Sequence, residues 1–314
     1  MIKIETLKLD DLALNHYKVI KNYLQNKEGG YSLEEINDKI KSCFGDSLDF
    51  KKLILAKPHE LEVLSEMYKW KCCKPFNYFK TLYNYLNKYD AIKFYTEEDS
   101  KKTPYRAYEL VKLLGVQTCP YCNRNTIYNI KNKTKRTSEL DHYYPKSKYP
   151  FFAISFYNLI PSCKVCNKIK LDNDDKKYIN PYDTRFDFNK NMKFGLQIEK
   201  SSFYYSENGF NFKYKFDAKI STDEKQRIEN NLNDFELKDL YDNHKDIILE
   251  LIQKAQIYND SYLDELMQKY EGTLFKNRED LLRLVTCGYV SDEDLHKRPL
   301  SKLIKDISEE LNLT

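Results

Sequence analysis

The sequence predicts an α+β chain that is mainly helical, with a cysteine-rich central segment and a small antiparallel β element after it. Eight glycines and nine prolines among 314 residues are under half of the roughly 12% that is typical of proteins, which favours long helices over turn-rich sandwiches. Hydrophobic residues make up 41% of the chain and aromatic residues 14%, a composition that excludes a disordered protein. The length is enough for two or three compact units without disulfides.

Helical spacing dominates the first part of the chain. Apolar residues recur there three and four positions apart, as in Leu61, Leu64 and Tyr68, and such a pattern places them on one face of a helix. Few helix breakers interrupt these stretches. We therefore expect residues 1–110 to form a helical N-terminal domain.

The remaining segments are a core, a β element and a second helical region. We expect a core over residues 111–188. Short apolar runs on either side of an Asn-Gly pair predict a β-hairpin or meander over residues 189–219. Ser221 and the glutamate three residues later fit a capping box, so residues 220–314 are expected to return to helix.

Four of the eight cysteines form two Cys-x-x-Cys pairs separated by 40 residues. One such pair alone could be a redox motif, but two pairs around a basic insert are typical of a zinc site. Four thiolates would leave no open coordination position, so this Zn²⁺ would be structural. The predicted ligands are Cys119, Cys122, Cys163 and Cys166.

Between and beyond the cysteine pairs lie the side chains that could carry chemistry. The segment ELDHYYPKSKYP contains Asp141 next to His142, and NLIPSCKVCNKIK follows with Asn167. A neutral histidine can take a proton from water, while a carboxylate and an amide oxygen can hold a hard cation such as Mg²⁺. These are the parts of a one-metal nuclease, although an isolated Asp-His pair is more often a surface ion pair.

Over residues 117–182 the chain resembles the HNH endonucleases, whose module is a ββα-metal fold. The resemblance rests on the Asp-His pair, the middle asparagine and the C-x-x-C-N-x-x-K run. It implies that His142 is the general base and Asp141 a ligand of the catalytic metal. It further implies that Asn158 supports the metal-binding loop and that Asn167 completes the metal site. An asparagine at this last position favours Mg²⁺ or Mn²⁺ over zinc or nickel.

The expected geometry agrees with one part of this assignment and is difficult to reconcile with another. A helix beginning at the second cysteine pair would place Asn167 and Lys170 on the side that carries the cysteines. In an ideal strand, however, Asp141 and His142 would point to opposite faces. The pair must therefore lie at a strand end or a distorted turn, and a regular strand through both residues would count against a shared phosphate.

The overall formal charge of +4 conceals a basic segment. Residues 119–170 hold ten Lys and Arg against two acidic residues, a local net charge of +8 that leaves −4 for the rest of the chain. Such a density of positive charge suits phosphate contacts, and we expect the partner to be nucleic acid, most simply double-stranded DNA. The candidate phosphate-binding residues are Arg124, Lys146, Lys168 and Lys170.

The sequence thus predicts a metal-dependent HNH endonuclease that hydrolyses phosphodiester bonds. It looks like the HNH subunits of bacterial anti-phage systems such as Septu and some retron-linked effectors, which implies a separate ATPase partner because this chain has no GxxxxGK[ST] motif. The alternative is a zinc-ribbon protein that binds nucleic acid or acts as a scaffold without catalysis. Without an apolar run of about 18 residues or a signal peptide, we expect a cytoplasmic protein and no membrane contact.

Overall fold

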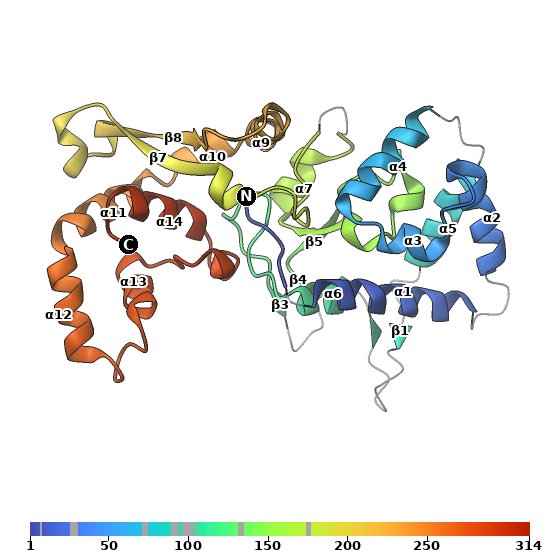
Figure 1. The fold of residues 1–314 in the computed structure, drawn as a ribbon, viewed down its shortest axis with the longest axis horizontal. Helices are drawn as coiled ribbons and strands as arrows, with labels where there is room; N and C mark the ends of the chain where they lie inside the picture. The colour runs from blue at the N-terminus through green and yellow to red at the C-terminus, as the bar shows by residue number, and fades with distance from the viewer. Residues whose placement is uncertain are drawn as a thin grey trace. The chain divides into compact units, whose positions relative to one another are not determined.

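The fold is that of a computed structural model. It describes the residues in the ranges 1–6, 8–25, 31–70, 75–88, 94–95, 104–105, 107–130, 135–173 and 177–314. Part of the lysine-rich insert, residues 131–134, lies outside these ranges. As predicted, the described chain is mainly helical with small antiparallel sheets (Figure 1). None of the helices in the described part has the length and apolar character needed to cross a bilayer.

The chain divides into two compact units. Unit 1 comprises Met1–Lys3, Gln117–Ile127 and Lys176–Thr314, and unit 2 comprises Ile4–Val116 and Tyr128–Asp175. This division differs from the boundaries expected from the sequence, because the N-terminal helical region and most of the expected nuclease core belong to one unit.

Six helices form most of the described part of unit 2. Two of them begin with the side-chain caps that satisfy free backbone amides at helix starts: Ser32 accepts from the amide of Glu35 at 3.0 Å, and Asp49 accepts from the amide of Lys52 at 2.8 Å. The helices are α1 (Leu9–Gln25), α2 (Leu33–Phe44), α3 (Phe50–Leu55), α4 (Pro58–Trp70), α5 (Phe76–Lys88) and α6 (Ala107–Leu114).

Three antiparallel strand pairs and a short helix account for the other regular elements among the described residues of unit 2. The pair that matters for the candidate site is β5 (Glu139–His142) with β6 (Leu159–Ser162), which is followed directly by helix α7 (Lys164–Lys170). The other strands are two residues long: β1 (Phe94–Tyr95) pairs with β2 (Pro104–Tyr105), and β3 (Asn129–Ile130) pairs with β4 (Lys135–Arg136).

The loop between β5 and β6 packs into the core formed by the helices. It contains two 3₁₀ turns, η2 (Pro150–Phe152) and η3 (Phe156–Asn158). The Phe151 ring lies 4.5 Å from the Tyr68 ring of α4 and 5.1 Å from the Phe44 ring of α2, both edge to face. Such aromatic contacts add stability beyond the buried area alone. The N-terminal helices therefore support the hairpin from which the candidate site is built.

Three hydrogen bonds anchor the same loop to the helices. His16 of α1 bonds the carbonyl of Ile154 at 2.9 Å, and the Ser155 hydroxyl donates to the carbonyl of Leu53 at 2.8 Å. The Tyr157 hydroxyl donates to Asp10 at 2.6 Å. Because these bonds join residues more than 100 positions apart, they fix the loop to α1 and α3 and limit its freedom.

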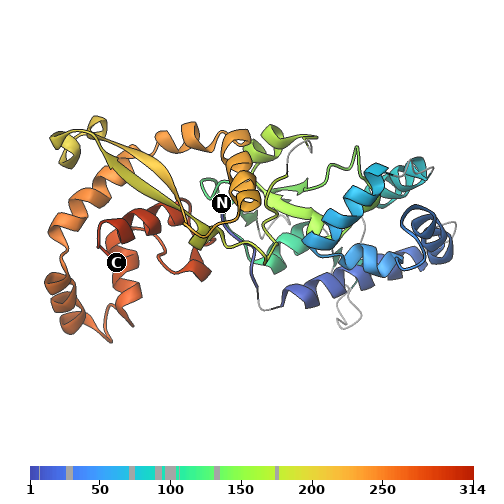
Figure 2. The same ribbon diagram turned by 45° about the horizontal axis from the view of Figure 1, so that its top comes forward.

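Unit 1 contains a two-stranded hairpin and seven helices among its described residues. Strand β7 (Met192–Ile198) pairs antiparallel with β8 (Phe210–Phe216) over their whole length, as predicted for residues 189–219, and the ribbon runs beside the last helix (Figures 1 and 2). The helices are α8 (Phe188–Asn191), α9 (Thr222–Asp234), α10 (Leu237–Asp242), α11 (Lys245–Ile257), α12 (Asp260–Tyr270), α13 (Arg278–Thr286) and α14 (Ser301–Glu310).

Carboxylates of α14 hold the free edge of β7. Asp306 accepts the backbone amide of Phe194 at 3.0 Å, and Glu310 accepts that of Leu196 at 2.9 Å. Alternate residues of an edge strand direct their amides to the same side, so two carboxylates one helical turn apart can satisfy both. Asp306 is also paired with Lys302 on the same helix at 2.9 Å.

Candidate functional site

The four cysteines of the two Cys-x-x-Cys pairs form a cluster. Their sulfur atoms all lie within 4.8 Å of one another, and all four residues are buried. A zinc ion with four Zn–S bonds of about 2.3 Å separates its sulfurs by roughly 3.8 Å, so this spacing suits one zinc ion. The described cysteines form no disulfide, and burial disfavours the exposed thiolate of a redox motif. The cluster could therefore bind zinc.

Each cysteine pair is shaped by its own backbone. In unit 1 the amide of Asn123 donates to the carbonyl of Cys119 at 2.7 Å, and the amide of Arg124 donates to the sulfur of Cys122 at 3.4 Å. In unit 2 Cys163 caps α7, where its sulfur accepts the amide of Cys166 at 3.4 Å. Amide donors favour the thiolate form, which is the form that binds zinc.

Asn123 ties the first cysteine turn to the C-terminal part of unit 1. It has a left-handed backbone with φ of 49°, which asparagine tolerates better than most residues. Its side chain donates to Thr118 and to the carbonyl of Leu295, at 3.0 and 2.9 Å, and accepts the amide of Lys302 at 3.0 Å. The turn that presents Cys119 and Cys122 is thus held by Leu295 and by the first turn of α14.

The β5–β6 hairpin and α7 bring most of the predicted site residues together in unit 2. In the hairpin, Asp141 is opposite Ile160 and His142 is opposite Leu159. The strand is regular through Asp141 and His142, and His142 is its last residue. The regular strand through both residues is the outcome that counts against a shared phosphate, whereas the position of His142 as the last strand residue meets the requirement for a strand end.

Asp141 is buried and paired with a lysine. Its carboxylate oxygens lie 3.0 and 3.2 Å from the Lys170 ammonium, which also donates to the backbone carbonyl of His142 at 2.9 Å. Lys170 was a predicted phosphate contact, but its side chain is only 1% exposed. The structure therefore places Lys170 inside the site as the partner of Asp141.

Asn167 and Glu139 form a second contact between α7 and β5. The Asn167 amide donates to the Glu139 carboxylate at 2.6 Å. Glu139 and Asp141 are two residues apart on β5 and therefore share a face, just as Asn167 and Lys170 share a side of α7. Glu139 was missed in the sequence, although its period-two spacing from Asp141 was a usable signal.

The donor set on this face suits a hard cation. Mg²⁺ is commonly held by one or two carboxylates together with water and phosphate oxygens, and Asp141 with the amide oxygen of Asn167 would supply two such oxygens. Among the described residues, however, the four cysteines are the one group of three or more His, Cys, Asp or Glu that meets the metal-site spacing. A catalytic ion here would therefore depend on an amide oxygen and on ligands from outside the chain.

His142 faces α5 on the other side of the strand. Its ring lies 5.6 Å from the Tyr83 ring at an angle of 85°, and it is hydrogen-bonded to the backbone of Ala153. Burial, followed by the positive charges of Lys146 and Lys170, lowers the pKa of His142 to about 3. The imidazole is therefore neutral at pH 7, and one ring nitrogen is fixed by the backbone bond.

Asn158 joins the two ends of the loop between β5 and β6. Its side chain accepts the amide of Tyr144 at 2.7 Å and donates to the carbonyls of Tyr144 and Phe152 at 3.2 and 2.9 Å. Its own carbonyl accepts the amide of Tyr143 at 2.9 Å. These bonds hold the chain directly after His142, so Asn158 positions the loop and lies fully buried within it.

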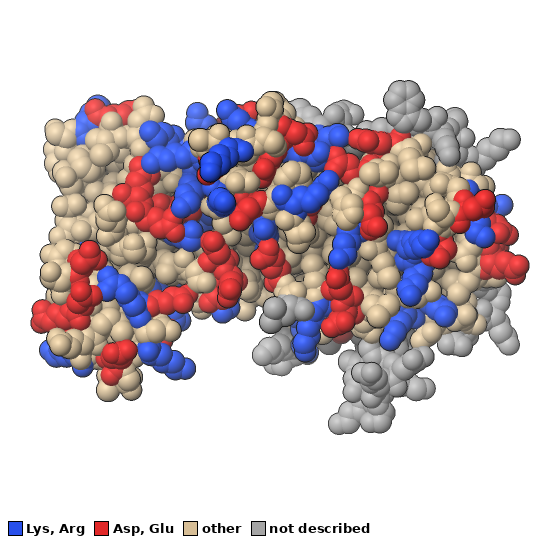
Figure 3. All heavy atoms as spheres, viewed as in Figure 1, with Lys and Arg blue, Asp and Glu red and all other residues tan. Residues whose placement is uncertain are grey.

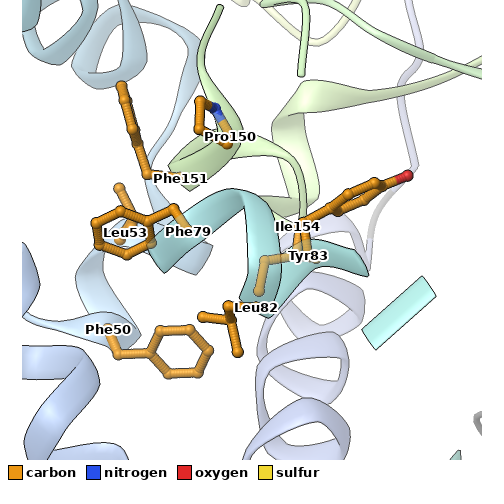
Figure 4. Close-up of a pocket in the computed structure, with 8 residues that line it drawn as sticks. All are labelled: Phe50, Leu53, Phe79, Leu82, Tyr83, Pro150, Phe151 and Ile154. Carbon is orange, nitrogen blue, oxygen red and sulfur yellow. The ribbon is translucent and has the colours of Figure 1, made fainter. Parts of the chain in front are cut away.

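Tyr83 links this site to the core of the helical region. Its ring lines a small apolar hollow together with Phe50, Leu82 and Phe151, among others, and its hydroxyl turns away from them (Figure 4). The hydroxyl lies 3.4 Å from the ammonium of Lys146. Tyr83 is 59 positions from His142, so no local pattern could have identified it.

The other predicted phosphate contacts differ in their surroundings. Lys146 and Lys168 are exposed, whereas the side chain of Arg124 in unit 1 donates to His244 at 3.1 Å. On the face that Figure 3 shows, basic and acidic side chains of the described residues are intermixed in both units. The local excess of lysine in the sequence does not form a large area of one sign on this face.

Comparison with known proteins gives one partial match. Septu protein PtuB of Bacillus thuringiensis is 37% identical to this chain over 65 residues, which are 20% of this chain and 23% of the relative. The match therefore spans less than a quarter of either protein. No family model matches the chain, and no solved structure matches it.

Proposed function

We propose that this chain is a metal-dependent HNH endonuclease that hydrolyses phosphodiester bonds in double-stranded DNA. The observation that carries the proposal is the β5–β6–α7 arrangement. It places His142 at a strand end, Asp141 on the strand face next to α7, and Asn167 on that helix. Strand, strand and helix occur in the order that the ββα-metal resemblance implies.

His142 acts as the general base in this proposal. Its ring is neutral, and the backbone bond of one nitrogen leaves the other to accept a proton from water. The water oxygen then attacks phosphorus, the bond from phosphorus to the leaving oxygen breaks, and solvent protonates that oxygen. Burial is the main cause of the low pKa of His142, and the positive charges of Lys146 and Lys170 lower it further. A phosphate near Lys146 would offset this second contribution and bring the pKa closer to the range in which a general base is efficient.

Asp141 and Asn167 would hold Mg²⁺ or Mn²⁺. Such an ion would polarise the scissile phosphate and stabilise the leaving oxygen. Because β5 ends at His142, the phosphate would lie beyond the end of the strand, where the two faces of the strand meet. Asn158 keeps the loop after His142 in place, and the exposed Lys146 and Lys168 contact the DNA backbone.

The second candidate is a zinc protein that binds nucleic acid or acts as a scaffold without catalysis. The observation that favours it is the buried Asp141–Lys170 pair, because a buried ion pair can be purely structural. In this case Asp141, His142 and Asn167 would have no role in cleavage.

Cleavage of supercoiled plasmid in Mg²⁺ or Mn²⁺ separates the two candidates. We expect the wild type to nick or linearise the plasmid, and His142→Ala to bind DNA but lose at least a hundredfold in cleavage rate, the effect typical of removing a general base. The matched control is His59→Ala, because His59 is exposed on α4. Equal cleavage by wild type and His142→Ala, or no metal-dependent cleavage by the wild type either alone or with its co-purified partner, would reject the nuclease.

The zinc site is tested by a separate substitution. Cys163→Ser should lower the bound zinc, measured by elemental analysis, and should destabilise the fold because metal binding contributes to folding free energy. Cys287→Ser is the matched control, since Cys287 is exposed and does not belong to the cluster. An unchanged zinc content in Cys163→Ser would rule out coordination by this cysteine.

We further propose that the chain is the nuclease component of an anti-phage defence system and works with a separate ATPase. The partial similarity to Septu protein PtuB supports a role in defence. The plasmid assay should therefore be run on the chain alone and on the chain co-purified with the product of the adjacent gene. Phage plaque counts on cells carrying the locus, with wild type or His142→Ala, measure the defence function directly.

A further inference from the structure

The buried ion pair of Asp141 and Lys170 lies within the candidate site. The side chains are 4% and 1% exposed, and both carboxylate oxygens of Asp141 face the Lys170 ammonium, at 3.0 and 3.2 Å. The third contact of the ammonium is the carbonyl of His142 at 2.9 Å. An ammonium has three N–H donors, and these three acceptors account for them.

This geometry places the Lys170 ammonium against the carboxylate that a catalytic cation would bind. Both oxygens of Asp141 are in contact with Lys170, so a divalent ion could bind them only by sharing or displacing the ammonium. Removing ions from water is costly, and a buried carboxylate is stable only when an opposite charge compensates it. Lys170 and a divalent ion would therefore be alternative partners of one carboxylate.

We propose that Lys170 is a positioning residue that acts as the built-in counter-ion of Asp141 and competes with the catalytic divalent cation for its carboxylate. The proposal rests on the proposed nuclease function, which makes Asp141 the ligand of that cation. Lys170 keeps Asp141 in the metal-binding orientation and lowers the affinity of the site for the ion. Lys170 lies on α7 one turn after Asn167, so the competing ammonium and the second metal ligand come from the same helix.

The competition predicts an unusual effect for a substitution near a metal site. Lys170→Met should bind Mn²⁺ about tenfold more tightly than the wild type, a change within the usual range of coupling between two bound groups. Affinity is measured by electron paramagnetic resonance of free Mn²⁺ on zinc-loaded protein, without DNA. The matched control, Lys168→Met, lies on the exposed side of the same helix and should bind Mn²⁺ as the wild type does.

Thermal unfolding gives a second measurement that does not depend on cleavage. Lys170→Met leaves a buried carboxylate without its charge partner, so the variant should be less stable than the wild type, and Mn²⁺ should raise its melting temperature more than that of the wild type. If the variant is unfolded on its own, Mn²⁺ should restore folding. A variant that gains nothing from millimolar Mn²⁺ would contradict the proposal.

Asp141→Asn distinguishes a failure of this proposal from a failure of the metal assignment. If Asp141→Asn loses Mn²⁺ affinity while Lys170→Met binds no more tightly than the wild type, the competition is wrong and Asp141 remains a ligand. If Asp141→Asn binds Mn²⁺ as well as the wild type, the ion binds elsewhere, and both the competition and the assignment of Asp141 fall. The plasmid assay with His142→Ala still decides whether the chain is a nuclease.

Discussion

Two buried lysine–aspartate pairs, one in each unit, have similar geometry and different surroundings. In unit 1, Lys302 and Asp306 lie one turn apart on α14, 2.9 Å from each other and fully buried. Asp306 also accepts the amide of Phe194 on β7. Burial raises the pKa of Asp306 and lowers that of Lys302, and their mutual attraction opposes both shifts.

In unit 2, Lys170 and Asp141 join a helix to a strand and lie directly beside His142 and Asn167. The pair in unit 1 adjoins a backbone amide and the structural charges of Lys305 and Asp292, whereas the pair in unit 2 contacts the backbone of a neutral histidine and lies on the helix that carries Asn167. Burial of an ion pair alone therefore says little about function. The chemistry of the neighbouring residues makes the pair in unit 2 a candidate for catalysis.

The largest expected effect is a loss of stability in unit 1, and Mn²⁺ affinity is the property that separates the two pairs. Lys302→Met would leave Asp306 buried without its charge partner and should lower the free energy of unfolding by about 3–5 kcal/mol, measured by urea denaturation. Unlike Lys170→Met, it should leave Mn²⁺ affinity unchanged. The control is Lys215→Met, which removes an ion pair with Glu310 at the surface and should cost under about 1 kcal/mol. Tighter Mn²⁺ binding by Lys302→Met would contradict the proposed difference between the two lysine–aspartate pairs.

Two buried asparagines allow the same comparison at a smaller scale. Asn158 and Asn123 each make three side-chain hydrogen bonds, so Asn158→Ala and Asn123→Ala should each lower the free energy of unfolding by about 2–4 kcal/mol. Asn158→Ala should also slow plasmid cleavage, because Asn158 holds the loop after His142.

The test of this difference is cleavage measured under conditions where both variants remain folded, as judged by circular dichroism. Asn123→Ala should retain the cleavage rate of the wild type once its zinc content is matched. If both substitutions slow cleavage equally at equal zinc content, the loop in unit 2 has no special role and the comparison between the units fails.

The smallest expected effect, taken per pH unit, concerns His16, which anchors the loop between β5 and β6. Burial lowers the pKa of His16 to about 4, below the value near 6.5 expected in the unfolded chain. The folded state therefore favours the neutral ring. Its contribution to stability is complete above about pH 6.5 and is lost as the pH falls toward 4, by at most roughly 1.4 kcal/mol per pH unit.

Urea denaturation of wild type and His16→Gln at pH 7, 6 and 5 measures this contribution. The wild type should lose stability more steeply on acidification than His16→Gln, and the exposed His59→Gln should follow the wild type. Parallel pH dependence in wild type and His16→Gln would mean that His16 does not bind its proton more weakly in the folded state. The other histidines are the same in wild type and His16→Gln, so their contributions to the pH dependence of stability cancel when the two proteins are compared.

The features predicted correctly from the sequence are those that depend on neighbouring residues. The low content of glycine and proline and the three- and four-residue apolar spacing indicated a mainly helical chain, and the segment around residues 192–216 forms the expected hairpin. A helix starting at the second cysteine pair was one geometry that the spacing of Cys163, Asn167 and Lys170 allowed, and α7 begins there. Helices, hairpins and caps depend on local contacts, which a linear pattern records.

The partners of the site residues could not be predicted in this way. Lys170 is a lysine beside the motif and was therefore predicted to contact phosphate. It is instead the buried partner of Asp141, 29 positions away. Arg124 donates to His244 across 120 positions. A lysine beside a motif has the same pattern whether it points to solvent or into the core, so only the folded structure separates the two.

The helical class, the two cysteine pairs and the motif of Asp141, His142 and Asn167 can be read from the sequence, because these depend on residue type and short spacing. Tertiary structure alone decided that Lys170 neutralises Asp141, that Tyr83 lies against His142, and that α1 and α3 anchor the loop between the strands. The physical reason is that a buried charge or ring must find its partner wherever packing places one. Distance along the chain does not limit that choice.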